Sequence, residues 1–161
     1  MHLKLAICTL TLLAALPSQA PASPVHISGT PGIVDGDTLR VGGTRIRLTG
    51  IDAPEKEQSC TRTDGSRWMC GQEAAKQLQA FIAGRTVDCV GSEKDRYQRL
   101  LAARSVAGID IGSWMVSHGW AVAYRRYSDA YVGDEDTARK GKLGIWAGQF
   151  TMPWVWRQEA R

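Results

Sequence analysis

The sequence has 161 residues, of which 43% are hydrophobic and 22% are charged, and its formal net charge at pH 7 is +4. This length is enough for one domain with a hydrophobic core, and no linker rich in Pro, Gly or Ser divides the chain, so we expect one folded domain rather than several. The mild positive charge permits a polyanionic partner without requiring one. Of the 20 basic residues 14 are arginine, whose planar guanidinium suits phosphate, although an arginine-rich genome gives the same bias.

The first 22 residues have the pattern of a secretory signal peptide. A short positive region ends at Lys4, an apolar run without charges extends over residues 5–16, and small residues follow as a cleavage site. The apolar run is too short to span a bilayer, which disfavours the alternative of an uncleaved anchor. We therefore predict a signal peptide over residues 1–22 and a secreted or periplasmic protein with no membrane attachment after cleavage.

Three cysteines follow this segment, at positions 60, 70 and 89. Cys60 and Cys70 enclose a polar loop, and an exported protein meets an oxidising compartment, so we predict a disulfide between them. Closing a loop of this length contributes roughly 2.5–3 kcal/mol in the chain-entropy model. Cys89 is left over. A zinc site is disfavoured because no second Cys or His pair stands at ligand spacing.

The predicted elements begin with a strand over residues 25–34 and a hairpin of strands 38–41 and 44–49 around Gly42-Gly43. A helix follows over residues 72–83, then strands 87–90 and 101–106, a short helix from Asp110 to Gly119, and a helix over 131–142. The acidic run 134–136 reads as a solvated helix start, and residues 151–161 as a tail that docks on the domain through its tryptophans. This order favours a small barrel with helices packed outside it.

Two motifs supply carboxylates near strand ends. In VDGDTL, Asp35 and Asp37 lie on one face of extended chain, and Gly36 allows the backbone to turn where a side chain would clash. In GIDAPE, Pro54 stiffens the backbone that presents Asp52 and Glu55. Carboxylates from two strand ends, with a backbone carbonyl, suit a hard cation such as Ca²⁺. Taken alone, Asp-Gly is more often simple turn chemistry.

Two arginines accompany these carboxylates. Arg47 lies on the outward face of its strand, and Arg99 ends the motif DRYQR. Two guanidinium groups facing a cation are the arrangement expected around a phosphodiester under in-line attack, where they stabilise the charge that builds on its oxygens. For either arginine alone, a surface salt bridge is the simpler interpretation.

The motifs VDGDTL, RLTGIDAPE and DRYQR, with the later pattern GWAVAYRRYS, resemble the staphylococcal nuclease (thermonuclease) family in order and spacing. The resemblance extends from about residue 33 to residue 146. It implies an α+β, mainly β fold, in which residues 25–150 form a five-stranded OB-fold barrel with three α-helices. It also implies a Ca²⁺-dependent nuclease that hydrolyses DNA and RNA by attack of water, with little sequence specificity and 3′-phosphate products. We expect a monomer.

The resemblance also assigns roles by position. Those roles are calcium ligation by Asp37, Asp52 and the carbonyl of Ala53; support of that shell by Asp35; activation of water by Glu55; phosphate binding by Arg47 and Arg99; and contact with the nucleotide by Tyr97 and Tyr124.

Two positions depart from the family pattern. Gln98 stands where the family usually has glycine, and if its φ is positive the cost is on the order of 1 kcal/mol and Arg99 could be misplaced. Arg104 stands where secreted relatives carry a cysteine that pairs with the counterpart of Cys89, so Cys89 should be unpaired here.

Two other classes of function compete with a nuclease. A non-catalytic barrel of this family would bind single-stranded nucleic acid or protein, and a secreted structural domain would do neither. A binding module has no physical need to keep the five residues together, and a structural domain explains neither the set nor its spacing. The set consists of Asp37, Arg47, Asp52, Glu55 and Arg99.

Overall fold

The protein is described by a computed structural model, which covers residues 23–160. The strands are β1 (Val25–Gly29), β2 (Gly32–Ile33), β3 (Thr38–Val41), β4 (Thr44–Leu48), β5 (Ile51–Asp52), β6 (Cys60–Thr61), β7 (Arg67–Trp68), β8 (Val87–Lys94), β9 (Leu100–Val106), β10 (Ile109–Asp110) and β11 (Val122–Ala123). The helices are α1 (Cys70–Ile82), α2 (Ile111–Ser117), α3 (Val132–Gly141), the 3₁₀ turn η1 (Gly144–Ala147) and α4 (Pro153–Glu159). The predicted signal peptide lies outside the described residues. Within residues 23–160, no helix is both long and apolar enough to cross a membrane.

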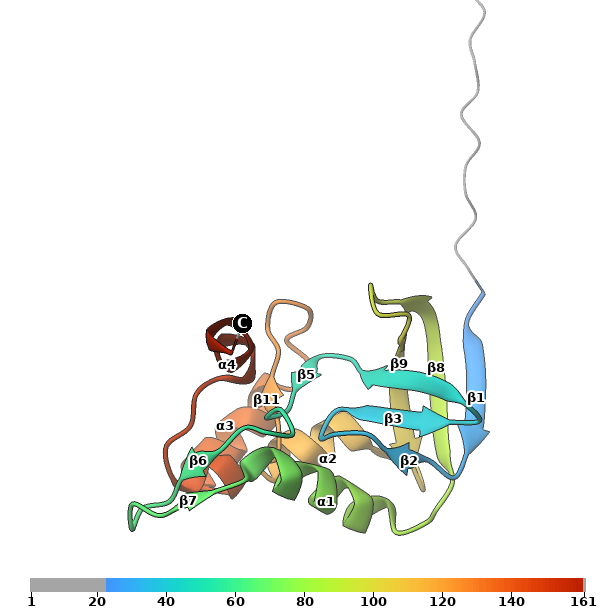
Figure 1. The fold of residues 1–161 in the computed structure, drawn as a ribbon. Coiled ribbons are helices and arrows are strands. Elements are labelled where there is room, and N and C mark those ends of the chain that lie inside the picture. The colour runs from blue at the N-terminus through green and yellow to red at the C-terminus, as the bar shows by residue number, and fades with distance from the viewer. Residues whose placement is uncertain (1–22, 161) are drawn as a thin grey trace, which may run out of the picture.

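Most of the strands form one curled sheet. Its order is β1-β8-β9-β4-β3-β2, with β10 pairing on β9. The pairing of β4 with β9 is parallel, and the other pairings are antiparallel. Figure 1 shows this sheet curving on itself, with α1 and α2 below it and α4 at the end of the molecule away from β1. The mixed α+β fold, mainly β and OB-like, is the one that the sequence predicts.

The main core lies inside this curled sheet, where alternate strand residues meet the apolar side of α1. On β4, Ile46 and Leu48 are buried while Arg47 between them points to the other face. Ala74, Leu78 and Ile82 of α1 recur at helical spacing and are buried in the same cluster. The alternation on β4 therefore directs an arginine out of the core at the edge of the site described below.

Several predicted elements are confirmed. The hairpin of β3 and β4 turns at Gly42 and Gly43, whose φ angles of 53° and 84° suit glycine. The predicted helices over 72–83 and 131–142 correspond to α1 and α3, and the structure adds α4 and several two-residue strands.

The acidic start of α3 differs from the sequence prediction at one residue. The sequence predicts a solvated run at 134–136, but Glu135 is only 1% exposed. Its carboxylate accepts a hydrogen bond from the backbone of Ala123 at 3.1 Å and pairs with Arg125 at 2.6 Å. Glu135 thus joins α3 to β11, because a buried carboxylate is tolerated where such partners are provided.

The C-terminal tail is held against the body of the protein. Gln149 and Thr61 exchange two backbone hydrogen bonds of 2.9 Å. Beyond them, Phe150, Met152 and Trp154 pack on a second apolar cluster that includes both cysteines of the disulfide. Pro153 then begins α4 at a position where proline's missing N–H costs nothing.

Candidate active site

The two aspartates named by the motifs are brought together at neighbouring strand ends. Asp37 precedes β3, and its carbonyl accepts a hydrogen bond of 2.8 Å from the backbone of Leu48 at the end of β4. Asp52 ends β5 a few residues later. Both side chains are buried, with residue exposures of 2% and 0%. Two buried carboxylates side by side need positive partners.

Gly36 allows the two carboxylate motifs to pack directly on each other. A Cβ at this position would lie 2.7 Å from the Cβ of Ala53, which is too close for any real contact. With the loops in contact, the backbone N–H of Ala53 donates to Asp37 Oδ2 at 2.9 Å. Asp35 supports the same loop, because its Oδ1 accepts from the backbone N–H of Asp37 at 3.0 Å. The expected clash at Gly36 is confirmed.

Arg47 joins the two aspartates through a single guanidinium group. Its Nη1 donates to Asp37 Oδ1, and its Nη2 donates to Asp52 Oδ1 at 2.7 Å. Because the two nitrogens belong to one rigid fork, the carboxylate oxygens that they bind must also lie close together. The structure thus places Asp37, Arg47 and Asp52 in mutual contact.

The electrostatics of this pair favour a cation. Burial raises the pKa of Asp37 to about 6 from its ordinary 3.8; Arg47 opposes the rise and the carboxylate of Asp35 adds to it. Burial likewise raises the pKa of Asp52, and a hydrogen bond from Arg157 is the main opposing effect. Both carboxylates are therefore held in a setting that penalises their charged form until positive charge is supplied.

The lone pairs left on these carboxylates also suit a metal ion. Asp37 Oδ2 accepts one hydrogen bond from the described residues, from Ala53, and Asp52 Oδ2 accepts one, from Arg157. A carboxylate oxygen has two lone pairs, so each oxygen keeps one for a hard cation. No cluster of three or more His, Cys, Asp or Glu able to hold a metal occurs within residues 23–160. A cation here would thus rely on two carboxylates, with water or backbone oxygens completing its shell.

Glu55 is held on a tightly fixed turn beside Asp52. Its backbone N–H donates to Gln58 Oε1 at 3.2 Å, and its carbonyl accepts from the backbone of Gln58 at 2.8 Å. Gly71 packs on the same carbonyl so closely that a Cβ there would lie 1.7 Å from the oxygen. The predicted disulfide is confirmed: Cys60 and Cys70 are bonded, and they connect the end of this segment to the start of α1.

Arg99 reaches the edge of the site rather than its centre. It pairs with Asp95 at 2.6 Å, and its Nη1 lies 3.5 Å from Thr38 Oγ1, which donates to Asp37 at 3.2 Å. Gln98 has φ 61°, so the condition under which glutamine would be strained here is met. The strain is accommodated within the turn of residues 95–99, where Gln98 donates to the carbonyl of Asp95 at 2.9 Å.

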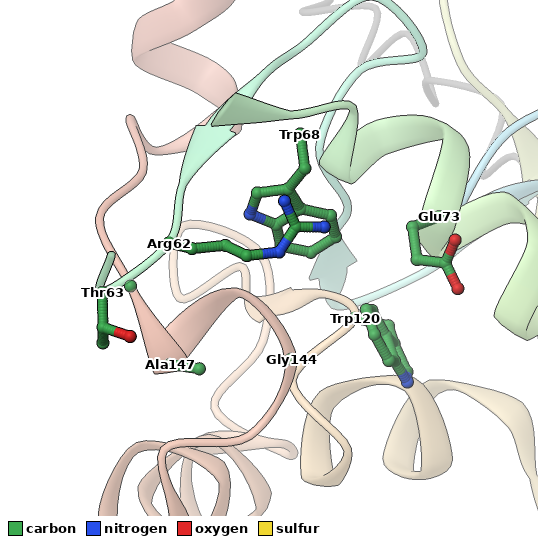
Figure 2. Close-up of a pocket in the computed structure, with 8 residues that line it drawn as sticks. Arg62, Thr63, Trp68, Glu73, Trp120, Gly144 and Ala147 are labelled. Carbon is green, nitrogen blue, oxygen red and sulfur yellow. The ribbon is translucent and has the colours of Figure 1, made fainter. Parts of the chain in front are cut away.

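A groove of about 1170 Å³ opens in front of these residues. Asp35, Arg47, Glu55 and Arg99 line it, and further arginines and the two predicted tyrosines extend it. Tyr97 is 55% exposed. A second hollow of about 550 Å³, shown in Figure 2, is lined by Arg62, Trp68 and Trp120 among others and contains none of the predicted site residues.

Tyr124 is predicted to contact the nucleotide, but neighbouring aromatic rings already cover part of its ring. Its ring stacks on Trp154 with the centroids 5.3 Å apart and the planes at 2°, and Tyr127 meets it edge-on at 4.9 Å. Both neighbours also line the groove. The structure therefore presents an aromatic group of three rings there rather than one isolated tyrosine.

Arg157 is a member of the site that the motifs do not indicate. It lies on α4, and its Nη1 contacts Asp52 Oδ1 at 3.0 Å and Glu55 Oε1 at 2.6 Å. Its Nη2 contacts Asp52 Oδ2 at 2.8 Å. The only local signal was its spacing from Trp154, which places both on one side of a short helix.

With this geometry established, the chain can be compared with known proteins. The family model described as staphylococcal nuclease homologue matches residues 45–148, more than half of the chain. The chain belongs to the staphylococcal nuclease family. This membership supports the function of a nuclease, a hydrolase of the endonuclease type.

Individual relatives agree with that membership. The chain is 34% identical over 143 residues to the succinoglycan biosynthesis protein ExoI of Rhizobium meliloti, covering 86% of this chain and 74% of the relative. It is 34% identical over 133 residues to an uncharacterized endonuclease of Escherichia coli O157:H7, with 78% and 80% covered. It is 33% identical over 147 residues to a micrococcal nuclease of Shigella flexneri, with 80% and 79% covered.

Proposed function

We propose that this member of the family is a secreted, Ca²⁺-dependent nuclease that hydrolyses phosphodiester bonds of DNA and RNA with little sequence preference. The observation that carries the proposal is the contact of two buried aspartates, Asp37 and Asp52, with the one guanidinium group of Arg47, which lines a groove rich in arginine. Relatives named as endonucleases and as a micrococcal nuclease support the reaction class.

A cation would be held by Asp37 and Asp52, through the oxygens that keep a free lone pair, with the carbonyl of Ala53 beside them. When bound, Ca²⁺ would supply positive charge next to the phosphate and reduce the cost of burying the two carboxylates. Asp35 would keep the loop of Asp37 in place through its hydrogen bond to that residue's backbone.

The remaining roles belong to three side chains that face the groove. Glu55 would take a proton from the attacking water, whose oxygen forms a bond to phosphorus as the bond to the 5′ oxygen breaks. Arg47 and Arg99 would bind the non-bridging phosphate oxygens while charge builds on them, with an effect on the order of 10³-fold or more. Cleavage on that side leaves a 3′-phosphate and a free 5′-hydroxyl.

The lining of the groove favours a nucleic-acid strand as substrate rather than a small phosphate ester. Arg45, Arg96 and Arg126 line the groove beyond the residues of the reaction, and the guanidinium carbons of Arg96 and Arg99 lie 4.8 and 5.3 Å from the centroid of the Tyr97 ring. Basic side chains with interleaved aromatic rings suit a single strand, because phosphates and bases alternate along it. The proposal of secretion rests on the signal-peptide pattern of residues 1–22. We also propose that the protein is a monomer.

The experiment that tests this function is cleavage of denatured DNA and of RNA with Ca²⁺ and with excess chelator. We expect cleavage with Ca²⁺ only. Glu55→Gln should lower kcat by about 10²-fold or more while binding of a single-stranded oligonucleotide, measured by fluorescence anisotropy, stays nearly unchanged. Undiminished cleavage in chelator would refute the cation requirement, and equal turnover by the variant would remove Glu55 from the reaction.

A further inference from the structure

The C-terminal helix α4 contacts the site at the point where Glu55 and Asp52 meet. Arg157 Nη1 donates to a carboxylate oxygen of each residue, and Nη2 donates to the second oxygen of Asp52. The Arg157 side chain is 31% exposed, the Glu55 side chain 29%, and the Asp52 side chain fully buried. The guanidinium therefore bridges a buried carboxylate and a carboxylate that faces the groove.

Within residues 23–160, Arg157 is the only hydrogen-bond partner of the Glu55 side chain. The backbone of Glu55 is fixed by Gln58 and Gly71, but nothing else described restrains the rotation of its carboxylate. A general base acts only when it is aligned with the proton it takes, and a misplacement of about 1 Å can cost on the order of 10²-fold in rate. The position of Glu55 thus depends on α4.

The tail itself is placed by contacts that also reach this turn. The side-chain amide of Gln58 is buried, and it accepts from the backbone of Glu55 at 3.2 Å while its Nε2 donates to the carbonyl of Thr151 at 2.6 Å. Trp154 stacks on Tyr124, and both residues line the groove. Gln58 therefore ties the Glu55 turn to Thr151, just before α4, and Arg157 ties the same turn to α4 itself.

We propose that Arg157 is a positioning residue for the hydrolysis: it holds the carboxylate of Glu55 beside Asp52, in the orientation from which Glu55 takes the proton of water. This inference rests on the proposed function. Asp52 Oδ2 keeps a lone pair when Arg157 is bound, so the arginine need not leave for a cation to be held. Arg157 and a bound cation can therefore act together.

A competing role makes the opposite prediction. If Arg157 instead blocked the site by occupying Asp52, its removal would raise cation affinity and activity together, because two ligands that exclude each other weaken each other by the same factor. If Arg157 positions Glu55, its removal lowers kcat and leaves KM and cation affinity almost unchanged. The sign of the change in kcat separates the two.

The test compares Arg157→Gln, Arg157→Lys and the control Arg40→Gln with wild type, using a single-stranded oligonucleotide and saturating Ca²⁺. Arg40 is exposed on β3, and its side chain donates a single hydrogen bond, to the carbonyl of Gly43 at 3.4 Å. We expect Arg157→Gln to lower kcat by about 10-fold to 100-fold, with KM within about threefold of wild type. Arg157→Lys should recover part of kcat, because an ammonium group can reach one carboxylate but not bridge both. The control should match wild type.

Two further measurements show whether Arg157 acts through Glu55. In the Glu55→Gln background, Arg157→Gln should cause less than about a threefold further loss, whereas independent effects would multiply. Calorimetric titration should give Arg157→Gln a Ca²⁺ affinity within about threefold of wild type. Circular dichroism and thermal unfolding identify any variant that has lost its fold. If Arg157→Gln does not fold, Arg157→Lys is compared with wild type in its place.

An unchanged or increased kcat in Arg157→Gln, or full multiplication of the two effects, would overturn the proposal. A failure of the proposed function looks different, because Glu55→Gln alone would then be as active as wild type. If Glu55→Gln is inactive while Arg157→Gln equals wild type, only the role of Arg157 is wrong.

Discussion

Asp37 and Asp52, which come from two different motifs, each accept a hydrogen bond from the same guanidinium group of Arg47. Asp37 directly precedes β3 of the curled sheet, and Asp52 ends β5, which pairs with β11 in a separate two-stranded sheet. The contact through Arg47 therefore joins the two sheets. Burial raises the pKa of both carboxyl groups, so the charged form of each is disfavoured although arginines pair with it. The free energy of unfolding should therefore depend on pH through these groups.

The first prediction concerns pH and Asp37. Its folded pKa is about 6, above the ordinary 3.8, so the folded state binds the proton more tightly. The resulting stabilisation is fully present below about pH 4 and is lost as the pH rises through 6, by up to about 3 kcal/mol. In chelator, Asp37→Asn should therefore gain stability relative to wild type between pH 4 and pH 7, measured as free energies of unfolding in urea. A difference that stays constant across this range would contradict the prediction.

The second prediction concerns Gln98, whose φ is 61°. Gln98→Gly should stabilise the protein by about 1 kcal/mol, because a left-handed conformation costs glycine nothing. Activity should change by less than about threefold, since Arg99 already reaches Thr38 beside Asp37. Urea unfolding and turnover check the two parts. A rise in kcat of tenfold or more would show that Gln98 does misplace Arg99.

The third prediction compares two helical glycines. Gly71→Ala should lower both stability and kcat, because its Cβ would meet the carbonyl of Glu55 at 1.7 Å and must displace that turn. Gly133→Ala in α3 has nothing within 4 Å of the added Cβ and should stabilise by roughly 0.5–1 kcal/mol. Thermal unfolding and turnover of both variants test this. Equal behaviour of the two would show that the Glu55 turn is not constrained by α1.

The fourth prediction concerns Arg104, a buried arginine directly opposite Cys89 in the pairing of β8 with β9. Burial lowers its pKa to about 10, and its Nε has no hydrogen-bond partner among the described residues. Facing residues of antiparallel strands lie within the Cα separation that a disulfide allows. Arg104→Cys should therefore pair with Cys89, which is buried and has no disulfide partner among residues 23–160 in wild type, and should stabilise by about 3 kcal/mol.

The matched control for that variant is Arg104→Ser, which lacks the thiol. Titration of the unfolded protein should find one free thiol fewer in Arg104→Cys than in wild type, and none fewer in the control. An unchanged thiol count would mean that the two side chains do not meet across the strands.

Much of this arrangement follows from local sequence. The Gly42-Gly43 hairpin and the outward direction of Arg47 are each set by residues within a few positions, so pattern and turn chemistry predict them. The prediction that Cys89 is unpaired is confirmed for the same reason, because position 104 carries no cysteine. The sequence also predicts that a side chain at position 36 would clash, but the residue it would meet, Ala53 of the second motif, is known only from the structure.

Other features depend on contacts between distant segments and leave no local signal. Arg157 meets Asp52 and Glu55 only because the tail folds back across the protein, and a short amphipathic helix does not name its target. Glu135 reads as a solvated acid until β11 is placed against α3. Gln58 is buried between the Glu55 turn and Thr151, and no motif or pattern in the sequence points to this role.

The most direct test of the account is calorimetric titration of Ca²⁺ into the wild type, Asp37→Asn, Asp52→Asn and the surface control Asp134→Asn. If Asp37 and Asp52 hold one cation between them, the wild type and the control bind a single Ca²⁺, and each of the other two variants loses that binding. Ca²⁺ binding as strong as in wild type by either Asp37→Asn or Asp52→Asn would contradict the account.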